Sequence, residues 1–473
     1  MDPEEFRRCG TDMVNYITDY MDTIRSRLPF PDVQPGFLRE QIPDEAPFHG
    51  ESWENVKNDL ERVVMKGLNQ WRSPHFHAFL PIASSFPALL GDMLAGAMIS
   101  SPGTWTSNPV GTELEVSMMD WLAKMLQLPQ QFLFSGGKGG GCIQASADDA
   151  TFVAIISARA KVIKQFKDKT KGQVLDKLIA YTSEEAHSSV EKAAHLALVE
   201  IRCLETDDKF ALRGTTLAAA IREDRKKGLI PFFVCATVGT TSTCAIDNIS
   251  EIGPICEEED LWLHIDAVYA GCACICPEYR PWINGVEYST TFSINPHKWL
   301  HINPPCSAFW VKDQELINEP LSVDAMYLRV RSASNGVTMP DFRNWHVQLT
   351  RPFGALKMWF VFRMFGVHGL QERIRKDMAM AKEFEALVLA DSRFEIVADV
   401  VSGLVCFRLK GDNAQNEKLL SMIDKSRRIC ITPSISRGIF YLRFCISVYT
   451  TESRDVVFAW EVIQHEADAL LSS

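Results

Sequence analysis

A lysine with two polar neighbours follows a strand-like segment in the second half of the chain. Residues 288–294 have the β-branched and aromatic composition of a strand, and Asn295, His297 and Lys298 come directly after it. A lysine there is badly placed for a solvated surface charge, but its amine can form a Schiff base with an aldehyde. We therefore predict that Lys298 is a catalytic lysine that holds an aldehyde cofactor.

A carboxylate upstream supplies the second half of this chemistry. Residues 261–266 have the pattern of a buried strand that ends in Asp266, and a turn containing Gly271 follows. A buried carboxylate without a partner would be costly, whereas at a strand end it can keep a pyridine nitrogen protonated. A Schiff-base lysine and an aspartate paired with a pyridinium are the protein's share of pyridoxal 5'-phosphate (PLP) chemistry. Asp266 and Lys298 together therefore predict PLP as the cofactor.

Apolar strands alternate with helical segments along most of the chain. Helical periodicity predicts helices at residues 3–27, 53–68, 86–99, 113–126 and 147–166. Strands are predicted at residues 178–181, 197–204, 231–236, 261–266, 288–294 and 306–311. This alternation predicts an α/β fold with a mainly parallel, helix-covered sheet in a large domain. After Pro352 a long helical stretch to about residue 390, and strands near 403–409 and 439–448, predict a small α+β C-terminal domain.

Matching segments occur in order along the whole chain. Besides the two segments above, they are residues 71–74, 113–121, 139–144, 186–189, 357–363 and 403–410. With these segments the chain resembles the group II PLP-dependent amino-acid decarboxylases, and within them the aromatic-L-amino-acid decarboxylases. The resemblance implies the fold type I architecture of PLP-dependent transferases. It implies an N-terminal helical arm for dimer packing (1–85), a large PLP-binding domain (86–352), a small C-terminal domain (353–473) and a homodimer with active sites at the interface.

Several further residues are expected to hold the cofactor. Ser146, Ala147 and Asp148 open a helix after the glycine run 139–141, where exposed N–H groups and the helix dipole favour a phosphate. Asn295 and His297 are expected to help anchor that phosphate. The resemblance implies that Thr241, in a Gly/Thr loop after a strand, lies near the ring hydroxyl of the cofactor.

Two residues are expected to manage substrate and protons. The resemblance implies that His187 stacks over the cofactor ring and that Tyr327 donates a proton to the substrate carbon after carbon dioxide leaves. Tyr327 precedes residues 330–338, whose serine, asparagine and glycine content is typical of a mobile loop. The alternative is that Tyr327 has only a structural role, in which its ring fastens this loop. The expected catalytic residues are thus Lys298, His187, Tyr327 and Asp266, and Arg351 is a weaker candidate for structuring the pocket.

The chain departs from the family pattern around the substrate. Asp148 replaces a serine or threonine, and Val268 replaces a small alanine below the cofactor ring. Residues 78–82 lose two hydroxyls of the family's substrate strand, and an isoleucine and an aromatic residue of the family are missing further on. The expected substrate-pocket residues are Trp71, Phe79, Leu80, Ile82, Ser101, Gly103, Pro304 and Thr350. The chemical core is therefore retained while the side-chain pocket is altered.

The expected function is PLP-dependent decarboxylation of an aromatic or related L-amino acid to the amine and carbon dioxide. One alternative is an aromatic aldehyde synthase, which uses oxygen and yields aldehyde, ammonia and peroxide. Members that do this commonly replace the equivalents of His187 or Tyr327, and this chain retains both. A second alternative is a catalytically weak paralog that acts as a binding or dimerisation partner, which Asp148 and Val268 motivate.

Composition excludes several other classes of partner. The 473 residues are 46% hydrophobic, with a net charge of −11 and no long basic run, so nucleic acid and anionic membranes are not expected partners. No apolar run reaches the roughly 18 residues that span a bilayer. Thirteen cysteines show no disulfide rhythm, and the cluster Cys272, Cys274 and Cys276 is better explained by burial than by a metal. We expect a small-molecule amino-acid substrate, no metal and a cytoplasmic location.

Overall fold

The computed structural model describes residues 1–80, 82–322, 339–446 and 448–472, in two compact units. The smaller unit comprises Met1–Pro81, Met380–Val397 and Val405–Ser473. The larger unit comprises Ile82–Ala379 and Ala398–Leu404. These two units are defined by compactness, whereas the three segments expected from the sequence (1–85, 86–352 and 353–473) are defined by function. The three functional segments therefore stay a prediction.

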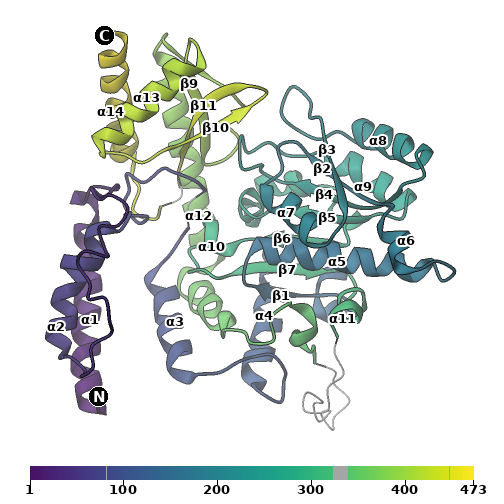
Figure 1. The fold of residues 1–473 in the computed structure, drawn as a ribbon, viewed down its shortest axis with the longest axis horizontal. Coiled ribbons are helices and arrows are strands. Elements are labelled where there is room, and N and C mark those ends of the chain that lie inside the picture. Colours follow the sequence, from purple (N-terminus) through teal and green to yellow (C-terminus); the bar gives the residue numbers. More distant parts are fainter. Residues whose placement is uncertain (81, 323–338, 447, 473) are drawn as a thin grey trace. The chain divides into compact units, whose positions relative to one another are not determined.

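A seven-stranded sheet forms the centre of the larger unit, in the order β1-β7-β6-β5-β4-β2-β3 (Figure 1). Its strands are β1 (Gly140–Gln144), β2 (Leu178–Ser183), β3 (Glu200–Leu204), β4 (Ile230–Thr237), β5 (Trp262–Asp266), β6 (Thr291–Ile294) and β7 (Ser307–Val311). Strand β7 runs antiparallel to both of its neighbours, β1 and β6. The other strands are parallel to one another. The predicted α/β fold with a mainly parallel sheet is confirmed.

Helices cover both faces of this sheet. The helices of the larger unit are α3 (Phe86–Met98), α4 (Pro109–Leu126), α5 (Ala147–Gln165), α6 (Lys171–Leu175), α7 (Ser188–Leu196), α8 (Gly214–Lys226), α9 (Ile249–Glu258), α10 (Pro296–Trp299), α11 (Glu315–Leu321) and most of α12 (Gly354–Ala390). The chain steps from β2 to β3 in one direction and from β3 to β4 and β5 in the other. Because parallel crossovers are right-handed, α7 lies on one face and α8 and α9 lie on the other.

The core of the larger unit lies between α5 and the sheet. Alanines and valines of α5 pack with large aromatic side chains of the strands, such as Phe233, Trp262 and Phe309. Strands β2, β5, β6 and β7 are buried along their whole length. Burial on both faces explains why these strands are near-continuous apolar runs rather than alternating patterns.

The smaller unit combines helices with a four-stranded sheet in the order β10-β11-β9-β8. Its strands are β8 (Phe394–Ile396), β9 (Leu404–Leu409, whose first residue belongs to the larger unit), β10 (Thr432–Ser436) and β11 (Ile439–Cys445). Its helices are α1 (Pro3–Thr23), α2 (Trp53–Asp59), α13 (Asn413–Ser426) and α14 (Ser453–Leu471). The Arg25 guanidinium, in the 3-10 turn that follows α1, pairs with buried Asp455 of α14, which ties the N-terminal helix to the C-terminal one. None of the described helices is long and apolar enough to cross a lipid bilayer.

The three clustered cysteines lie at or next to a short 3-10 helix, Ala270–Ile275, and are buried. The Cys272 thiol donates to the Asn295 carbonyl at 3.3 Å, and the Cys274 thiol donates to the Tyr279 carbonyl at 3.4 Å. The Cys276 thiol points to the Gln371 carbonyl at 3.8 Å. Each thiol therefore has its own backbone partner.

Candidate active site

The sequence-predicted cofactor residues of the larger unit follow the carboxyl ends of parallel strands. Because the carboxyl ends of parallel strands meet at one edge of a sheet, side chains that follow them gather there. The residues are Ser146, Ala147 and Asp148 after β1, His187 after β2, Thr241 after β4, Asp266 at the end of β5, and Asn295, His297 and Lys298 after β6. Tyr327 lies outside the described residues.

Asp266 is a buried carboxylate among charged groups. Its side chain is 2% exposed, and its Oδ1 accepts the backbone N–H of Val268 at 3.3 Å. Burial raises the pKa of Asp266, and the positive charge of Lys298 and the Val268 N–H oppose that rise, whereas Asp148 adds to it. A buried carboxylate with a raised pKa gains most from a cation placed beside it. The site therefore fits a protonated pyridine nitrogen.

Lys298 lies on α10, a helix of a single turn. Asn295 precedes this helix and is buried, and its Oδ1 accepts the Ser307 hydroxyl at 2.6 Å. The Asn295 N–H donates to the Val268 carbonyl at 3.0 Å, and the Lys298 N–H donates to the Asn295 carbonyl at 2.8 Å. These bonds connect the lysine's helix to the loop that follows Asp266.

His187 caps α7 with its own ring. The His187 Nδ1 accepts the Ser189 backbone N–H at 3.2 Å and lies 2.8 Å from the Ser189 hydroxyl. Because Nδ1 is an acceptor, the neutral ring carries its hydrogen on Nε2. The side chain is exposed in this single chain. His187 therefore presents an Nε2–H donor rather than a free Nδ1.

His297 is held in the neutral form beside β7. Its Nδ1 lies 2.6 Å from the Cys306 carbonyl, and burial lowers the pKa of His297 to about 4. The carbonyl of His297 accepts the backbone N–H of Ala83 at 2.7 Å. This bond places Ile82, a predicted substrate-pocket residue, next to the segment that carries Lys298.

The N-terminus of α5 is capped by Ser146, and Asp148 points to a neighbouring helix. The Ser146 hydroxyl accepts the Asp149 N–H at 3.1 Å and donates to the Asp149 carboxylate at 2.8 Å. The Asp148 Oδ2 lies 3.7 Å from the Lys192 Nζ of α7. The first N–H groups of a helix have no acceptor within that helix, so those of Ala147 and Asp148 suit a phosphate.

Replacing Asp148 with serine is therefore expected to change PLP affinity by less than tenfold. A carboxylate aimed at the phosphate would repel it by roughly 3 kcal/mol at about 5 Å and an effective dielectric of 20. That repulsion would weaken PLP affinity by about tenfold or more. Lys192 offsets part of that charge. The measurement is PLP titration of the apo protein at matched pH and salt. In a double-mutant cycle, Lys192→Met should weaken PLP binding in the wild type more than in Asp148→Ser. If Lys192→Met changed PLP affinity equally in the wild type and in Asp148→Ser, Lys192 would not be offsetting the charge of Asp148.

A buried arginine organises the predicted pocket loop at 101–103. The Arg351 N–H donates to the Ser101 hydroxyl at 3.2 Å, and its Nη1 donates to the Pro102 carbonyl at 2.9 Å. Its guanidinium pairs with buried Glu115, which also accepts the Ile143 N–H at 2.8 Å. This ion pair connects the pocket loop to α4 and β1.

The other predicted pocket residues differ in exposure. Gly103 is buried, and a Cβ at this position would lie 3.2 Å from the Arg343 Cγ, so the aromatic residue of the family would require Arg343 to move. Ser101 is half-buried, Ile82 is 40% exposed, and Pro304 and Thr350 are exposed. In the smaller unit Trp71 stacks on Phe79 with ring centres 5.3 Å apart, and Leu80 is buried.

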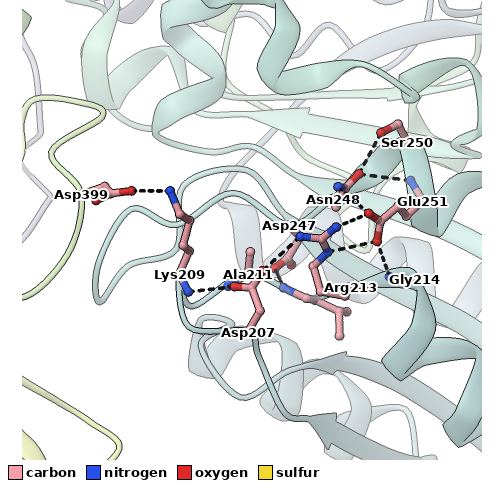
Figure 2. A network of polar contacts seen from close by, with 11 residues as sticks. Asp207, Lys209, Ala211, Arg213, Gly214, Asp247, Asn248, Ser250, Glu251 and Asp399 are labelled. Atoms are coloured by element: carbon pink, nitrogen blue, oxygen red, sulfur yellow. Dashed lines mark hydrogen bonds and ion pairs between the residues drawn. The ribbon is translucent and has the colours of Figure 1, made fainter.

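A polar network that the sequence did not single out supports the loop of Thr241 (Figure 2). Buried Asp247 accepts the backbone N–H groups of Thr237 and Leu212, each at 2.7 Å, and so closes the loop between β4 and α9. Arg213 beside it pairs with Glu251 and with Asp207. Nothing in the local sequence marks Asp247, because its partners are backbone groups that only the fold brings near.

Asp247 is expected to make stability depend on pH. Burial raises the pKa of Asp247 from 3.8 to about 6, although the two N–H donors oppose the rise. Its contribution to stability is therefore fully present below about pH 4 and is lost as the pH rises through 6, with a shift of about two units worth roughly 3 kcal/mol. Asp247→Asn removes this titrating group. The melting temperature of the variant minus that of the wild type should therefore increase between pH 4 and 7. A difference that does not vary with pH would contradict this.

Comparison with known proteins gives a consistent assignment. Residues 35–410 match the model of the pyridoxal-dependent decarboxylase conserved domain. The aromatic-L-amino-acid decarboxylase of Sus scrofa is 49% identical over 100% of this chain and 98% of that protein, and the histidine decarboxylase of Homo sapiens is 46% identical over 100% and 72%. The crystal structure of Catharanthus roseus tryptophan decarboxylase with L-tryptophan has a TM-score of 0.94 at 38% identity, covering 99% of both chains. That of Rhodiola rosea 4-hydroxyphenylacetaldehyde synthase has a TM-score of 0.92 at 38% identity, with the same coverage.

The chain therefore belongs to the pyridoxal-dependent decarboxylase family. It is a PLP-dependent amino-acid decarboxylase, as the sequence predicted. The cofactor prediction is confirmed at the level of the family, whereas the roles of individual residues stay predictions.

Proposed function

We propose that this chain removes the carboxyl group of an aromatic or related L-amino acid as carbon dioxide and releases the amine. The observation that carries this proposal is the placing of Asp266 and Lys298 after neighbouring parallel strands, β5 and β6, where the charge of Lys298 acts on Asp266. The full-length similarity to decarboxylases of aromatic amino acids and of histidine supports this substrate class.

Each residue of the site has a proposed part in the reaction. PLP supplies an aldehyde that holds amines and a ring that accepts electrons when a bond to the α-carbon breaks. Lys298 would hold that aldehyde carbon, and Asp266 would keep the ring nitrogen protonated. The helix N-terminus at Ser146, Ala147 and Asp148, with Asn295 and His297, would hold the phosphate. His187 would cover the ring and offer its Nε2–H, Thr241 would lie near the ring hydroxyl, and the Tyr327 phenol would give its proton to the substrate carbon.

Product analysis with a panel of L-amino acids tests the proposal. Purified protein with PLP is incubated with L-tryptophan, L-tyrosine, L-phenylalanine, L-DOPA and L-histidine, and amine and carbon dioxide are measured. We expect at least one substrate to give the two products in equal amounts, with Lys298→Ala as the inactive control. PLP-loaded protein that gives no amine with any of them would contradict the proposal. Failure to bind PLP, seen as no visible absorbance band, would instead favour a non-catalytic binding partner.

Aldehyde formation is the second candidate. The similarity to Rhodiola rosea 4-hydroxyphenylacetaldehyde synthase favours it, because 99% of each chain is covered at 38% identity. Retention of His187 and Tyr327 favours the amine instead. Hydrogen peroxide and oxygen uptake, measured beside the amine, separate the two outcomes. Peroxide in an amount equal to the product would favour the aldehyde route.

The substrate pocket is expected to show little preference for L-DOPA over L-phenylalanine. Ile82 stands where the family has a hydroxyl-bearing residue and offers neither a donor nor an acceptor. A catechol hydroxyl buried there without a partner would cost on the order of 1–3 kcal/mol. We therefore expect similar kcat/KM values for the two substrates, and Ile82→Thr should shift the ratio toward L-DOPA. A large L-DOPA preference in the wild type would contradict this role for Ile82.

A homodimer is proposed as the functional assembly. Helix α3 of the larger unit exposes an apolar face at helical spacing, formed by Phe86, Leu90, Met93, Leu94 and Met98, which are each 41–52% exposed. An apolar face of this kind on a single chain is typical of a surface that another protein covers. Leu90→Glu should convert a dimer into a monomer in sedimentation experiments, whereas Leu198→Glu, at another exposed leucine, should not.

A reducing compartment, such as the cytosol, is proposed as the location. None of the thirteen cysteines, all of which lie among the described residues, forms a disulfide, and all but Cys203 are buried. Free cysteines in such number are typical of proteins that are not exposed to an oxidising environment. Location of the tagged chain in an oxidising compartment would contradict the proposal.

A further inference from the structure

We infer that Asp377 is a positioning residue for Lys298 and that it acts through the indole of Trp299. The inference rests on the proposed role of Lys298. Asp377 lies on α12, far from α10 in sequence.

Trp299 directly follows Lys298 and is anchored at its indole nitrogen. The side chain is fully buried, and its Nε1–H donates to the Asp377 Oδ2 at 2.9 Å. The other oxygen of Asp377, Oδ1, lies 2.6 Å from the Nη2 of Arg373, one helical turn earlier on α12. Both Asp377 and Arg373 are buried, so the carboxylate that receives the indole also belongs to a buried ion pair.

The same indole also contacts the loop that follows Asp266. The rings of Trp299 and Tyr269 stack with centres 4.7 Å apart and planes 12° apart. Tyr269 is likewise fully buried and comes three residues after Asp266. The Trp299 ring therefore connects the helix of Lys298 to the loop after Asp266. Its face contacts Tyr269 in that loop, and its indole N–H, at the ring edge, binds Asp377.

Helix α10 cannot fix its own orientation. It spans Pro296–Trp299, and one helical turn gains too few internal hydrogen bonds to be stable in isolation. Its orientation must come from tertiary contacts. Asn295 and His297 hold the start of the helix, and Trp299 is the largest buried side chain at its end, so the direction in which Lys298 points depends on the Trp299 anchor as well.

Trp299→Phe is the direct test, because phenylalanine retains an aromatic face for Tyr269 and removes the N–H donor. Trp310→Phe on β7 is the matched control: Trp310 is equally buried, and its Nε1 has no hydrogen-bond partner among the described residues. Both variants lose the same ring volume, but only the first loses an anchor. A misplaced reacting group can lower a rate by up to about a hundredfold.

We expect Trp299→Phe to lower kcat by about tenfold or more, with a small change in KM and with PLP still bound. Trp310→Phe should keep a kcat within about threefold of the wild type at a similar melting temperature. The visible spectrum of the bound cofactor should change in Trp299→Phe and not in the control. Equal kcat values and equal spectra for the two variants would overturn the inference.

A double-mutant cycle covers the case in which Trp299→Phe fails to fold or acts through lost packing. Asp377→Asn keeps an acceptor oxygen but loses the charge that pairs with Arg373. If Asp377 acts through Trp299, the double variant should lose no more kcat than the worse single variant, whereas additive losses would overturn the coupling. If Trp299→Phe fails to fold, an Asp377→Asn variant with wild-type kcat and spectrum overturns the inference. The wild type is measured first: a wild type with no amine product refutes the proposed function, whereas an active wild type with indistinguishable variants refutes only this inference.

Discussion

Replacing Lys298 with alanine is expected to abolish decarboxylation while the fold remains intact. Lys298 is half-buried on a one-turn helix at the carboxyl edge of the parallel sheet, and its charge acts on buried Asp266. Alanine removes the amine without disturbing the buried Trp299 that follows. Loss of a residue that holds the reacting group covalently lowers the rate by several orders of magnitude.

Borohydride reduction followed by peptide mapping is the measurement for this variant. In the wild type, reduction in the presence of PLP should fix the cofactor on the peptide that contains Lys298. Lys164→Met is the matched lysine control, because Lys164 pairs with Glu319 on the surface and its loss should leave that labelled peptide unchanged. A reducible adduct in Lys298→Ala, on any lysine, would refute the assignment.

Replacing Asp266 with asparagine is expected to lower kcat/KM by about a hundredfold to a thousandfold. Asparagine has nearly the same shape and can still accept the Val268 N–H, but it has no negative charge with which to hold a ring nitrogen protonated. Burial raises the pKa of Asp266, so the ionised carboxylate gains from a cation placed beside it. A neutral amide therefore removes the electrostatic part of the interaction and little else.

Steady-state kinetics and PLP titration together check this second variant. We expect Asp266→Asn to bind PLP, since the phosphate side of the site is unaltered, and to show a shifted visible spectrum. The melting temperature of the apo variant should not fall, because a buried carboxylate with a raised pKa is replaced by a neutral group. A kcat/KM within threefold of the wild type would mean that Asp266 does not act on the ring.

The strands were predictable where the sequence has long apolar runs. The predicted strand at 231–236 lies within β4 (Ile230–Thr237), and that at 261–266 differs from β5 (Trp262–Asp266) by one residue. Strand β3 starts at Glu200 rather than at the predicted residue 197, because Ala197 caps the end of α7. Strand β1 was missed because its Gly-Gly-Cys opening lacks β-branched and aromatic residues and is held by pairing with β7.

The candidate site was predictable where chemistry-bearing residues end strands. Asp266 ends β5 and Lys298 lies on the short helix that follows β6, so their placing at one sheet edge follows from parallel topology. Lys192, Asp247 and Asp377 could not be predicted in the same way. Each acts through a partner on another element, at distances that only packing sets, and each is an ordinary helix or loop residue in the sequence.

Because of strand β7, the site should tolerate insertions after this strand better than insertions before it. As the antiparallel strand of the sheet, it begins at the edge where its neighbours end, and its start holds two site residues: Ser307 binds Asn295, and the carbonyl of Cys306 binds His297. An extra residue in the turn that leads from Lys298 into β7 would shift both bonds at once. An extra residue after Val311, at the opposite edge, would shift neither. Insertions before β7 should therefore impair the candidate site, whereas insertions after β7 should spare it and disturb only the backbone bonds of Lys312 to Thr290 and of Gln314 to Lys138.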